Sequence, residues 1–170
     1  DIRLHPCSIV SKSHSESAFY TGKVDWVKKI KESGLKNINF SQNTSTVNYL
    51  SKIDILVTDV SSISFEAYLL DIPVIFYHTK DFWFNYKKSV YKKYMLSGNE
   101  IFLEENEYLN GGREGGIVVS NVEDLIYFIN KIKDNKDPSQ LKRREFSRKL
   151  LFNKGKSSLA IKKRFKELLN

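Results

Sequence analysis

The sequence predicts an α/β fold, a Rossmann-like open parallel sheet with helices on both faces. Short apolar runs alternate with amphipathic segments along most of the 170 residues, which is the pattern of βαβ units. The run Asp54–Asp59 (DILVTD) is bounded by acidic residues and is typical of a strand buried on both faces. A second apolar run, Pro73–Tyr77, follows after one helix-sized segment, so these two strands are expected to be parallel neighbours.

Each element follows from a local signal. Strands are expected where apolar residues run together, and helices where apolar residues recur every three or four positions. Ser61 and Ser62 offer hydroxyl caps to one helix, and Asn121 is the expected N-cap of another. The expected strands are 2–4, 37–40, 54–59, 73–77 and 117–119. The expected helices are 24–33, 46–52, 63–70, 122–133, 139–152 and 158–169.

The net charge of +8 is concentrated at the C-terminal end of the chain. Residues 136–170 hold 12 basic and 3 acidic residues, whereas residues 1–79 hold 8 of each. Such a stretch attracts polyanions, whether nucleic acid, anionic lipid or a polyphosphate polymer, although a solvated face of a lysine-rich protein explains it equally well. We expect a Rossmann-like domain over 1–135 and basic C-terminal helices over 136–170 that pack on the same domain.

Composition excludes several classes of protein. With 41% apolar and 28% charged residues, wholesale disorder is excluded. No apolar run approaches the ~18 residues of a membrane-spanning helix. Cys7 is the single cysteine, so no internal disulfide and no cysteine-based zinc site are expected, and His5, Cys7 and His14 match no standard metal spacing. The chain lacks an initiator Met and begins inside a strand, so we expect a piece of a larger protein.

Parallel α/β sheets bind ligands beyond the carboxyl ends of their strands. This rule points to His5, to 58–62 and to 77–81, although His78 itself is expected at the surface. The densest signal is 57–67 (VTDVSSISFEA), which is a strand end, a polar turn and a helix start. Free backbone N–H groups and the hydroxyls of the turn form an anion site suited to a pyrophosphate, and Glu66 can accept from ribose hydroxyls. Two serines before a helix are also an ordinary cap.

The segment ILVTDVSSISFEAYLLDIPVIFY resembles the signature of the CDP-glycerol glycerophosphotransferase family, which includes teichoic-acid and capsule polymerases. The family reads as an apolar strand, T-D-Y-S-S, a helix with an acidic residue and a strand that begins at proline; here Val60 stands for the usual Tyr. Arg3–Pro6 (RLHP) resembles the family's basic-x-His-Pro. Phe152–Ser158 (FNKGKSS) resembles a late Gly-Lys/Arg turn, with Lys154 where the family usually has Asp.

The resemblance implies a GT-B architecture in which this chain is the C-terminal, nucleotide-donor-binding half. The implied reaction transfers polyol phosphate from a CDP-polyol, CDP-glycerol above all, to a polyol-phosphate or glycan acceptor and releases CMP. No cofactor and no metal are implied. The family's Trp-His-Gly-like motif belongs to the N-terminal half and does not occur here, so we expect the missing half to be a partner and this fragment alone to be inactive.

The resemblance also implies roles for particular residues. His5 is the expected catalytic residue, which as a cation offsets charge on the leaving CMP or protonates it. Its alternative role is to order the turn before Pro6. Arg3, on the same strand face, reaches the same anion or forms a structural ion pair. The expected nucleotide- and phosphate-binding residues are Arg3, Thr58, Asp59, Ser61, Ser62, Glu66, Gly155, Lys156 and Ser157.

Two other functions are compatible with the sequence. One keeps the fold but uses a sugar nucleotide, as a GT-B glycosyltransferase for capsule or lipopolysaccharide. The other is a non-enzymatic module that binds polyanions through 136–170, without specific nucleic-acid recognition. The basic C-terminal helices predict a cytoplasmic protein attached peripherally to an anionic membrane surface, the inner face of the bacterial cell membrane.

Overall fold

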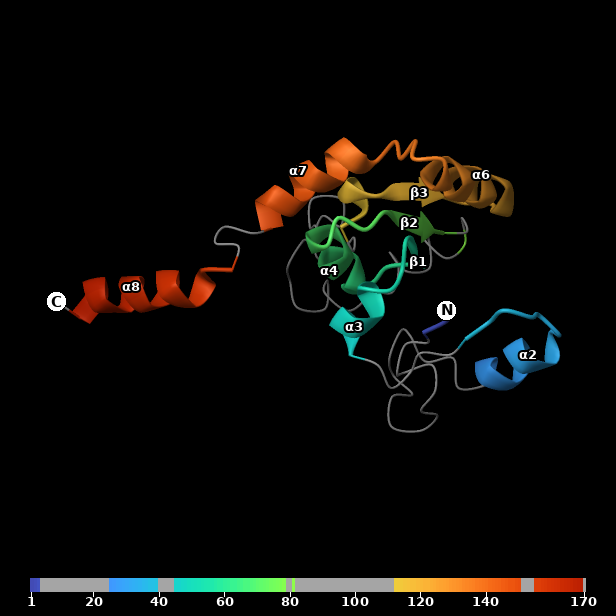
Figure 1. Ribbon diagram of the computed structural model, residues 1–170, viewed down its shortest axis with the longest axis horizontal. Helices are drawn as coiled ribbons and strands as arrows, with labels where there is room; N and C mark the ends of the chain where they lie inside the picture. Colours follow the sequence, from blue (N-terminus) through green and yellow to red (C-terminus); the bar gives the residue numbers. More distant parts are fainter. Residues whose placement is uncertain (4–24, 40–44, 79–80, 82–111, 151–154, 170) are drawn as a thin grey trace.

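The computed structural model describes residues 1–3, 25–39, 45–78, 81, 112–150 and 155–169 (Figure 1). Strands β1 (Leu56–Thr58), β2 (Val74–Tyr77) and β3 (Ile117–Val119) form a three-stranded open sheet in the order β1-β2-β3. Both pairings are parallel, with Leu56 opposite Val74 and Ile75 opposite Ile117. The predicted α/β, Rossmann-like fold is confirmed.

The helices of the described residues fall where the sequence places them, within a few residues at each end. The helix predicted over 122–133 matches the observed helix at both ends. Asn121 caps it, because its side chain accepts from the N–H of Asp124 at 2.8 Å. The helices are α2 (Trp26–Glu32), α3 (Thr46–Leu50), α4 (Ile63–Leu69), α6 (Val122–Lys133), α7 (Gln140–Leu150) and α8 (Ser157–Leu169), with a 3-10 turn η1 (Arg113–Gly115).

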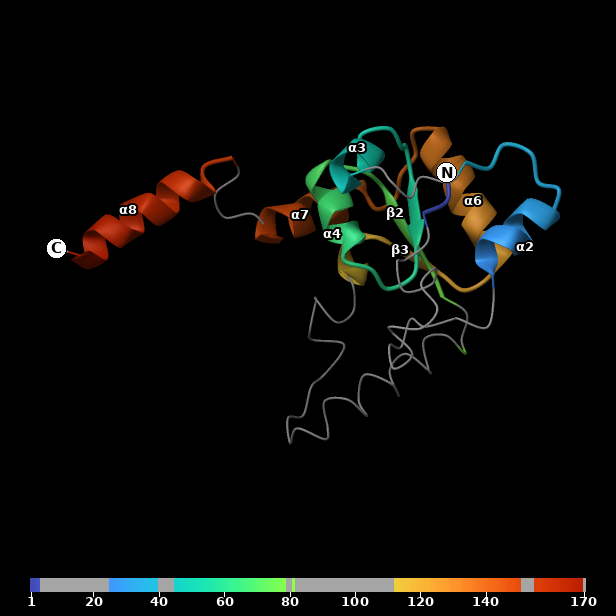
Figure 2. The same cartoon turned by 90° about the horizontal axis from the view of Figure 1, so that it is seen from below.

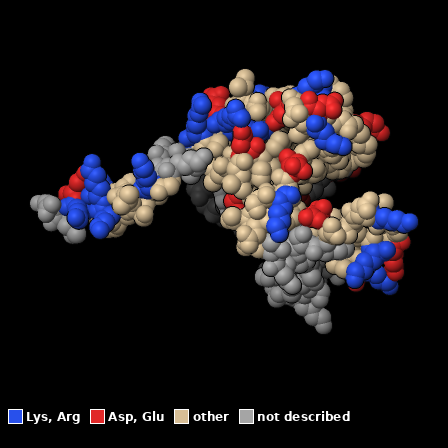
Figure 3. Space-filling model, in the orientation of Figure 1, with Lys and Arg blue, Asp and Glu red and all other residues tan. Residues whose placement is uncertain are grey.

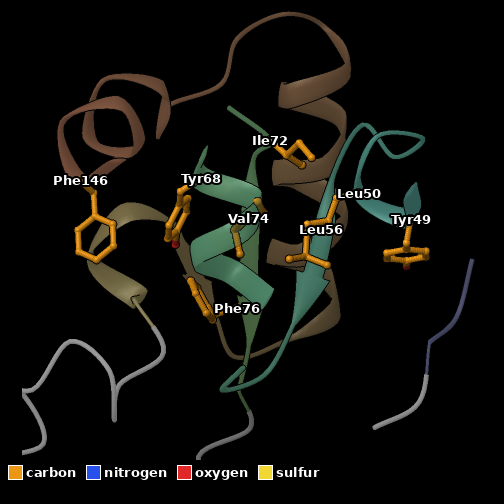
Figure 4. Packing of buried hydrophobic residues seen from close by; sticks show 9 residues of the cluster. Tyr49, Leu50, Leu56, Tyr68, Ile72, Val74, Phe76 and Phe146 are labelled. Carbon is orange, nitrogen blue, oxygen red and sulfur yellow. The ribbon is translucent and has the colours of Figure 1, made fainter. Parts of the chain in front are cut away.

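Helices cover both faces of the sheet, as the alternation of side chains on β2 requires. Val74 and Phe76 point to one face, where they meet α4 and Phe146 of α7 (Figure 4). Ile75 points to the other face, where β3 and α6 complete a second apolar cluster. Strand β2 is therefore the strand buried on both faces. The same expectation for 54–59 is wrong at Val57, which is 44% exposed, because β1 pairs with β2 alone among the described strands.

The strand expected over 37–40 is absent from its described part, 37–39. Asn37 has a φ of 70°, a left-handed conformation that interrupts an extended run. Its neighbour Asn39 still holds the start of the chain, because its carbonyl accepts from the N–H of Ile2 at 2.7 Å. Within the described residues, an isolated β-bridge at Ile2 and this hydrogen bond stand where the strand was expected.

The approach to β3 is fixed by contacts with α4 and β2. The hydroxyl of Tyr68 donates to the carbonyl of Gly112 at 2.8 Å, and Gly112 has a φ of 73° that favours glycine. A Cβ on Gly116 would lie 2.8 Å from the Val74 carbonyl oxygen, so only glycine lets β3 begin so close to β2. These contacts place η1 beside α4, where α7 also packs.

The C-terminal helices differ in position. Helix α7 packs on α4 and η1, whereas α8 lies outside the body of sheet and helices in both views (Figures 1 and 2). None of the described helices combines the length and apolar character that crossing a membrane requires. The division of the chain at residue 135 stays a prediction.

Candidate functional site at the carboxyl edge of the sheet

The polar turn after β1 lies at the carboxyl edge of the sheet. Thr58 ends β1 opposite Phe76 of β2, and the chain turns through 59–62 before α4 begins at Ile63. The carboxyl ends of parallel strands share one edge, so this turn and the residue after β2 are neighbours in space. Thr58 is half-buried and Asp59 is exposed. The structure therefore brings Thr58, Asp59, Ser61 and Ser62 together at one edge.

The two serines of this turn use their polar groups differently. Ser61 organises the turn: its Oγ accepts from the N–H of Ile63 at 3.4 Å, and its carbonyl accepts from the Ser64 hydroxyl at 2.7 Å. Ser62 is the N-cap by position, but it is exposed and its side chain makes no cap hydrogen bond. The expected hydroxyl cap is thus formed by Ser61 alone, and the Ser62 hydroxyl faces solvent at the start of α4.

Glu66 is the acidic residue in the first turn of α4 and is exposed. It follows Ser62 by four residues, so the two lie on one side of the helix start. A hydroxyl and a carboxylate separated by one helical turn offer a donor for an anion and an acceptor for hydroxyl groups. The expected division between phosphate and ribose contacts stays a prediction.

His78, which follows β2, is a residue that sequence reasoning placed wrongly at the surface. It is 3% exposed, its backbone N–H donates to Val119 at 2.9 Å, and its ring lies 6.0 Å from that of Phe76. Burial, reinforced by the nearby charge of Arg113, lowers the pKa of His78 from 6.5 to about 4, although a hydrogen bond with the Asp59 backbone raises it. A neutral imidazole therefore joins the ends of β1 and β2. Its place directly after an apolar strand was its sequence signal, but that signal does not tell whether the strand is central in the sheet.

Arg113 in η1 is a second residue that the sequence did not single out. It is half-buried, and burial lowers the pKa of its guanidinium, which stays charged at neutral pH. Its charge reaches His78, so it contributes positive potential near this edge of the sheet. The adjacent Glu114 turns to α7 instead, 3.4 Å from Lys149. The Gly-rich flanks of Arg113 were its only sequence signal.

The other expected site residues lie elsewhere or outside the described residues. His5 lies outside them. Arg3 is half-buried, and its Cζ lies 5.6 Å from the centre of the Tyr49 ring on α3. Gly155, Lys156 and Ser157 are exposed at the start of α8, which both views separate from the body (Figures 1 and 2). The structure does not bring these three residues to the turn after β1.

The chemistry available at this edge is recognition of an anion. Hydroxyls of the turn, the positive end of the α4 dipole and the charge of Arg113 all favour a negatively charged ligand. Within the described residues, no group of three or more His, Cys, Asp or Glu side chains is placed to hold a metal ion. A phosphorylated ligand is the class that fits this arrangement.

Comparison with protein families gives one result. Residues 27–165 match the model of the family described as CDP-glycerol:poly(glycerophosphate) glycerophosphotransferase, a range that includes the turn after β1 and all of α7. Neither curated proteins nor solved structures give a significant match. The family indicates a transferase that uses CDP-glycerol as donor and a polymer as acceptor. With most of its length inside that match, the chain belongs to the CDP-glycerol glycerophosphotransferase family.

Proposed function

We propose that this chain is the donor-binding half of a glycerophosphotransferase with GT-B architecture, and that it holds CDP-glycerol at the turn after β1. The observation that carries the proposal is the match of the family across a strand-end turn that leaves the Ser62 hydroxyl exposed. The second half of the enzyme is the proposed partner that completes catalysis.

Each part of the site has a role in this proposal. Ser61, Ser62 and the positive end of the α4 dipole hold the pyrophosphate, and Thr58 lines the same turn. Glu66 accepts from the ribose hydroxyls. Asp59 positions the turn through its backbone hydrogen bond with His78. The guanidinium of Arg113 adds positive charge for the donor phosphates.

The proposed reaction is a phosphoryl transfer from donor to acceptor. A hydroxyl oxygen of the acceptor, a polyol-phosphate or glycan of the cell envelope, attacks the β-phosphorus of CDP-glycerol. A new P–O bond forms while the bond to the oxygen that bridges the two phosphates breaks, and CMP leaves with that electron pair. The acceptor hydroxyl loses its proton. His5, carried over from the resemblance, offsets the charge of CMP or protonates it.

Donor binding is tested by calorimetric titration of the chain with CDP-glycerol. We expect Ser61→Ala and Ser62→Ala to weaken binding about tenfold each, because each removes a hydroxyl donor to phosphate. Ser51→Ala is the matched control, since Ser51 is an exposed serine after α3 whose hydroxyl bonds only its own helix. Wild-type affinity in both turn variants and in His5→Ala would overturn the site assignment.

The base of the nucleotide separates the donor classes. CDP-glycerol, CDP-ribitol, CMP, UDP-glucose and UMP are titrated under the same conditions. Cytidine-selective binding supports the glycerophosphotransferase proposal. Uridine-selective binding would replace it with a sugar-nucleotide transferase, and absence of binding by every nucleotide would contradict a donor site on this chain.

A further inference from the structure

Helix α8 presents a row of large apolar side chains to solvent. Ile161, Phe165 and Leu168 are spaced four and three residues apart, so they share one face of the helix. Their exposed fractions are 57%, 62% and 67%. We call these three residues the α8 stripe. Exposed apolar side chains that gather on one face mark an interaction surface more often than scattered ones do.

Basic residues border the α8 stripe. The segment 156–169 contains five basic residues and one acidic residue, Glu167, which lies 3.1 Å from Arg164. At 100° per residue, Lys162 and Arg164 fall at the two borders of the stripe. Lys163 and Lys166 fall on the opposite face. Figure 3 shows Lys and Arg side chains along the visible side of α8.

No described helix or strand shares an extensive contact with α8. The helix lies away from the sheet in two perpendicular views, so the body does not cover the stripe (Figures 1 and 2). A partner that binds this surface must bury the α8 stripe and also offer negative charge to the basic residues beside it.

We propose that α8 is an interfacial helix that lies on an anionic phospholipid surface. The α8 stripe enters the boundary between headgroups and acyl chains, while Lys162 and Arg164 contact lipid phosphates. This proposal goes beyond nucleotide binding and does not depend on it. Charge complementarity favours lipid over a second copy of the chain, since pairing two stripes would bring the bordering cations of both copies together. A soluble polyanion would leave the stripe in water.

The proposal is tested by floating the full chain with vesicles of phosphatidylcholine alone or mixed with phosphatidylglycerol. We expect binding to the mixed vesicles only. Phe165→Ser should reduce the partition coefficient about tenfold, because it removes the largest apolar side chain of the stripe. Leu141→Ser is the matched control: Leu141 is 80% exposed on α7, and its replacement should leave partitioning unchanged.

Charge is tested by a second pair of variants. The double variant Lys162→Glu/Arg164→Glu should abolish flotation, whereas Lys28→Glu/Lys29→Glu, an exposed lysine pair on α2, should retain most of it. Equal binding by wild type and Phe165→Ser would reduce the interaction to general electrostatics and overturn the proposal. No flotation of the wild type would overturn it as well. So would sedimentation as a dimer that Phe165→Ser converts to a monomer, because the stripe would then join two copies.

Discussion

Helices α7 and α8 are both basic and follow one another in the chain, but they meet the rest of the molecule differently. Helix α7 buries Phe146 and Arg143, each 2% exposed, against the sheet-bearing body. Helix α8 leaves its own phenylalanine, Phe165, 62% exposed. The difference lies in the surface that receives each helix rather than in its charge.

The surface on which α7 packs is formed by α4 and the turn that follows α4. The Phe146 ring lies 5.3 Å from that of Tyr68 in an edge-on arrangement and 6.2 Å from that of Phe65. Arg143 donates to Asp71 at 2.8 Å and to Asp137. A cationic helix with such partners is part of the fold. A cationic helix without such partners is available to bind another surface. The net charge of a helix therefore does not tell which of these two roles it has.

The largest effect expected from this comparison is on Phe146. Phe146→Ala should lower the free energy of unfolding by about 4 kcal/mol, because it removes a buried ring and leaves a cavity beside Tyr68. Phe165→Ala is the matched control and should change it by less than about 0.5 kcal/mol. Urea denaturation of both variants measures the difference. Equal losses would mean that α8 also packs on the body in solution.

Arg143 carries the next largest effect. Arg143→Ala should cost about 3 kcal/mol, because it leaves the carboxylates of Asp71 and Asp137 without their buried partner. The exposed Arg148 on the same helix is the control, and Arg148→Ala should be nearly neutral. Urea midpoints at neutral pH compare the two variants. A neutral Arg143→Ala would show that apolar packing alone seats α7.

The ion pairs of α7 also have a pH signature. Burial raises the pKa of Asp71 and Asp137, but hydrogen bonds from Arg144 and Arg143 to Asp71, and from Arg143 and Ser139 to Asp137, hold both pKa values below the ordinary 3.8. Their stabilising contribution is therefore complete above pH 3.8 and is lost as the pH falls through the lower, folded-state values.

The buried histidine of the candidate site has a pH effect that lies at higher pH than that of these carboxylates. The pKa of His78 is about 4 in the folded chain against 6.5 ordinarily, so stability is complete above pH 6.5 and declines between 6.5 and 4. The decline is at most about 1.4 kcal/mol per pH unit. His78→Gln should flatten it, whereas Arg143→Ala should keep it. Urea midpoints of the wild type and both variants, measured across this pH range, test this prediction. A decline that persists in His78→Gln would show that another titratable group causes it.

The parts of the fold that local signals determine could be predicted from the sequence. The helix over 122–133 has a clear cap and a clear apolar period, and both ends are correct. The exposure of Val57 and the burial of His78 could not be predicted, because they depend on which strand is central in the sheet. Strand order is a property of tertiary packing that a single run of residues does not carry.

The candidate site shows the same division. The turn from Thr58 to Ser62 is contiguous in sequence and remains contiguous in space. Arg113 comes from a distant turn, and Tyr68 and Gly116 fix the approach to β3 that follows it. A resemblance that relies on motif order placed Gly155–Ser157 in the site, but the described structure holds them at the start of an outlying helix.

The smallest effect on stability is expected from removing α8. Deletion of residues 155–170 should leave the urea midpoint of the chain unchanged within error, because the described α8 buries none of its apolar stripe against the body. The same deletion should abolish flotation with vesicles that contain phosphatidylglycerol. A protein that keeps its stability and loses its lipid binding would separate the two basic helices by function: α7 stabilises the fold and α8 binds a surface. A large loss of stability would show instead that the stripe is covered by this chain, and the contrast between the two helices would disappear.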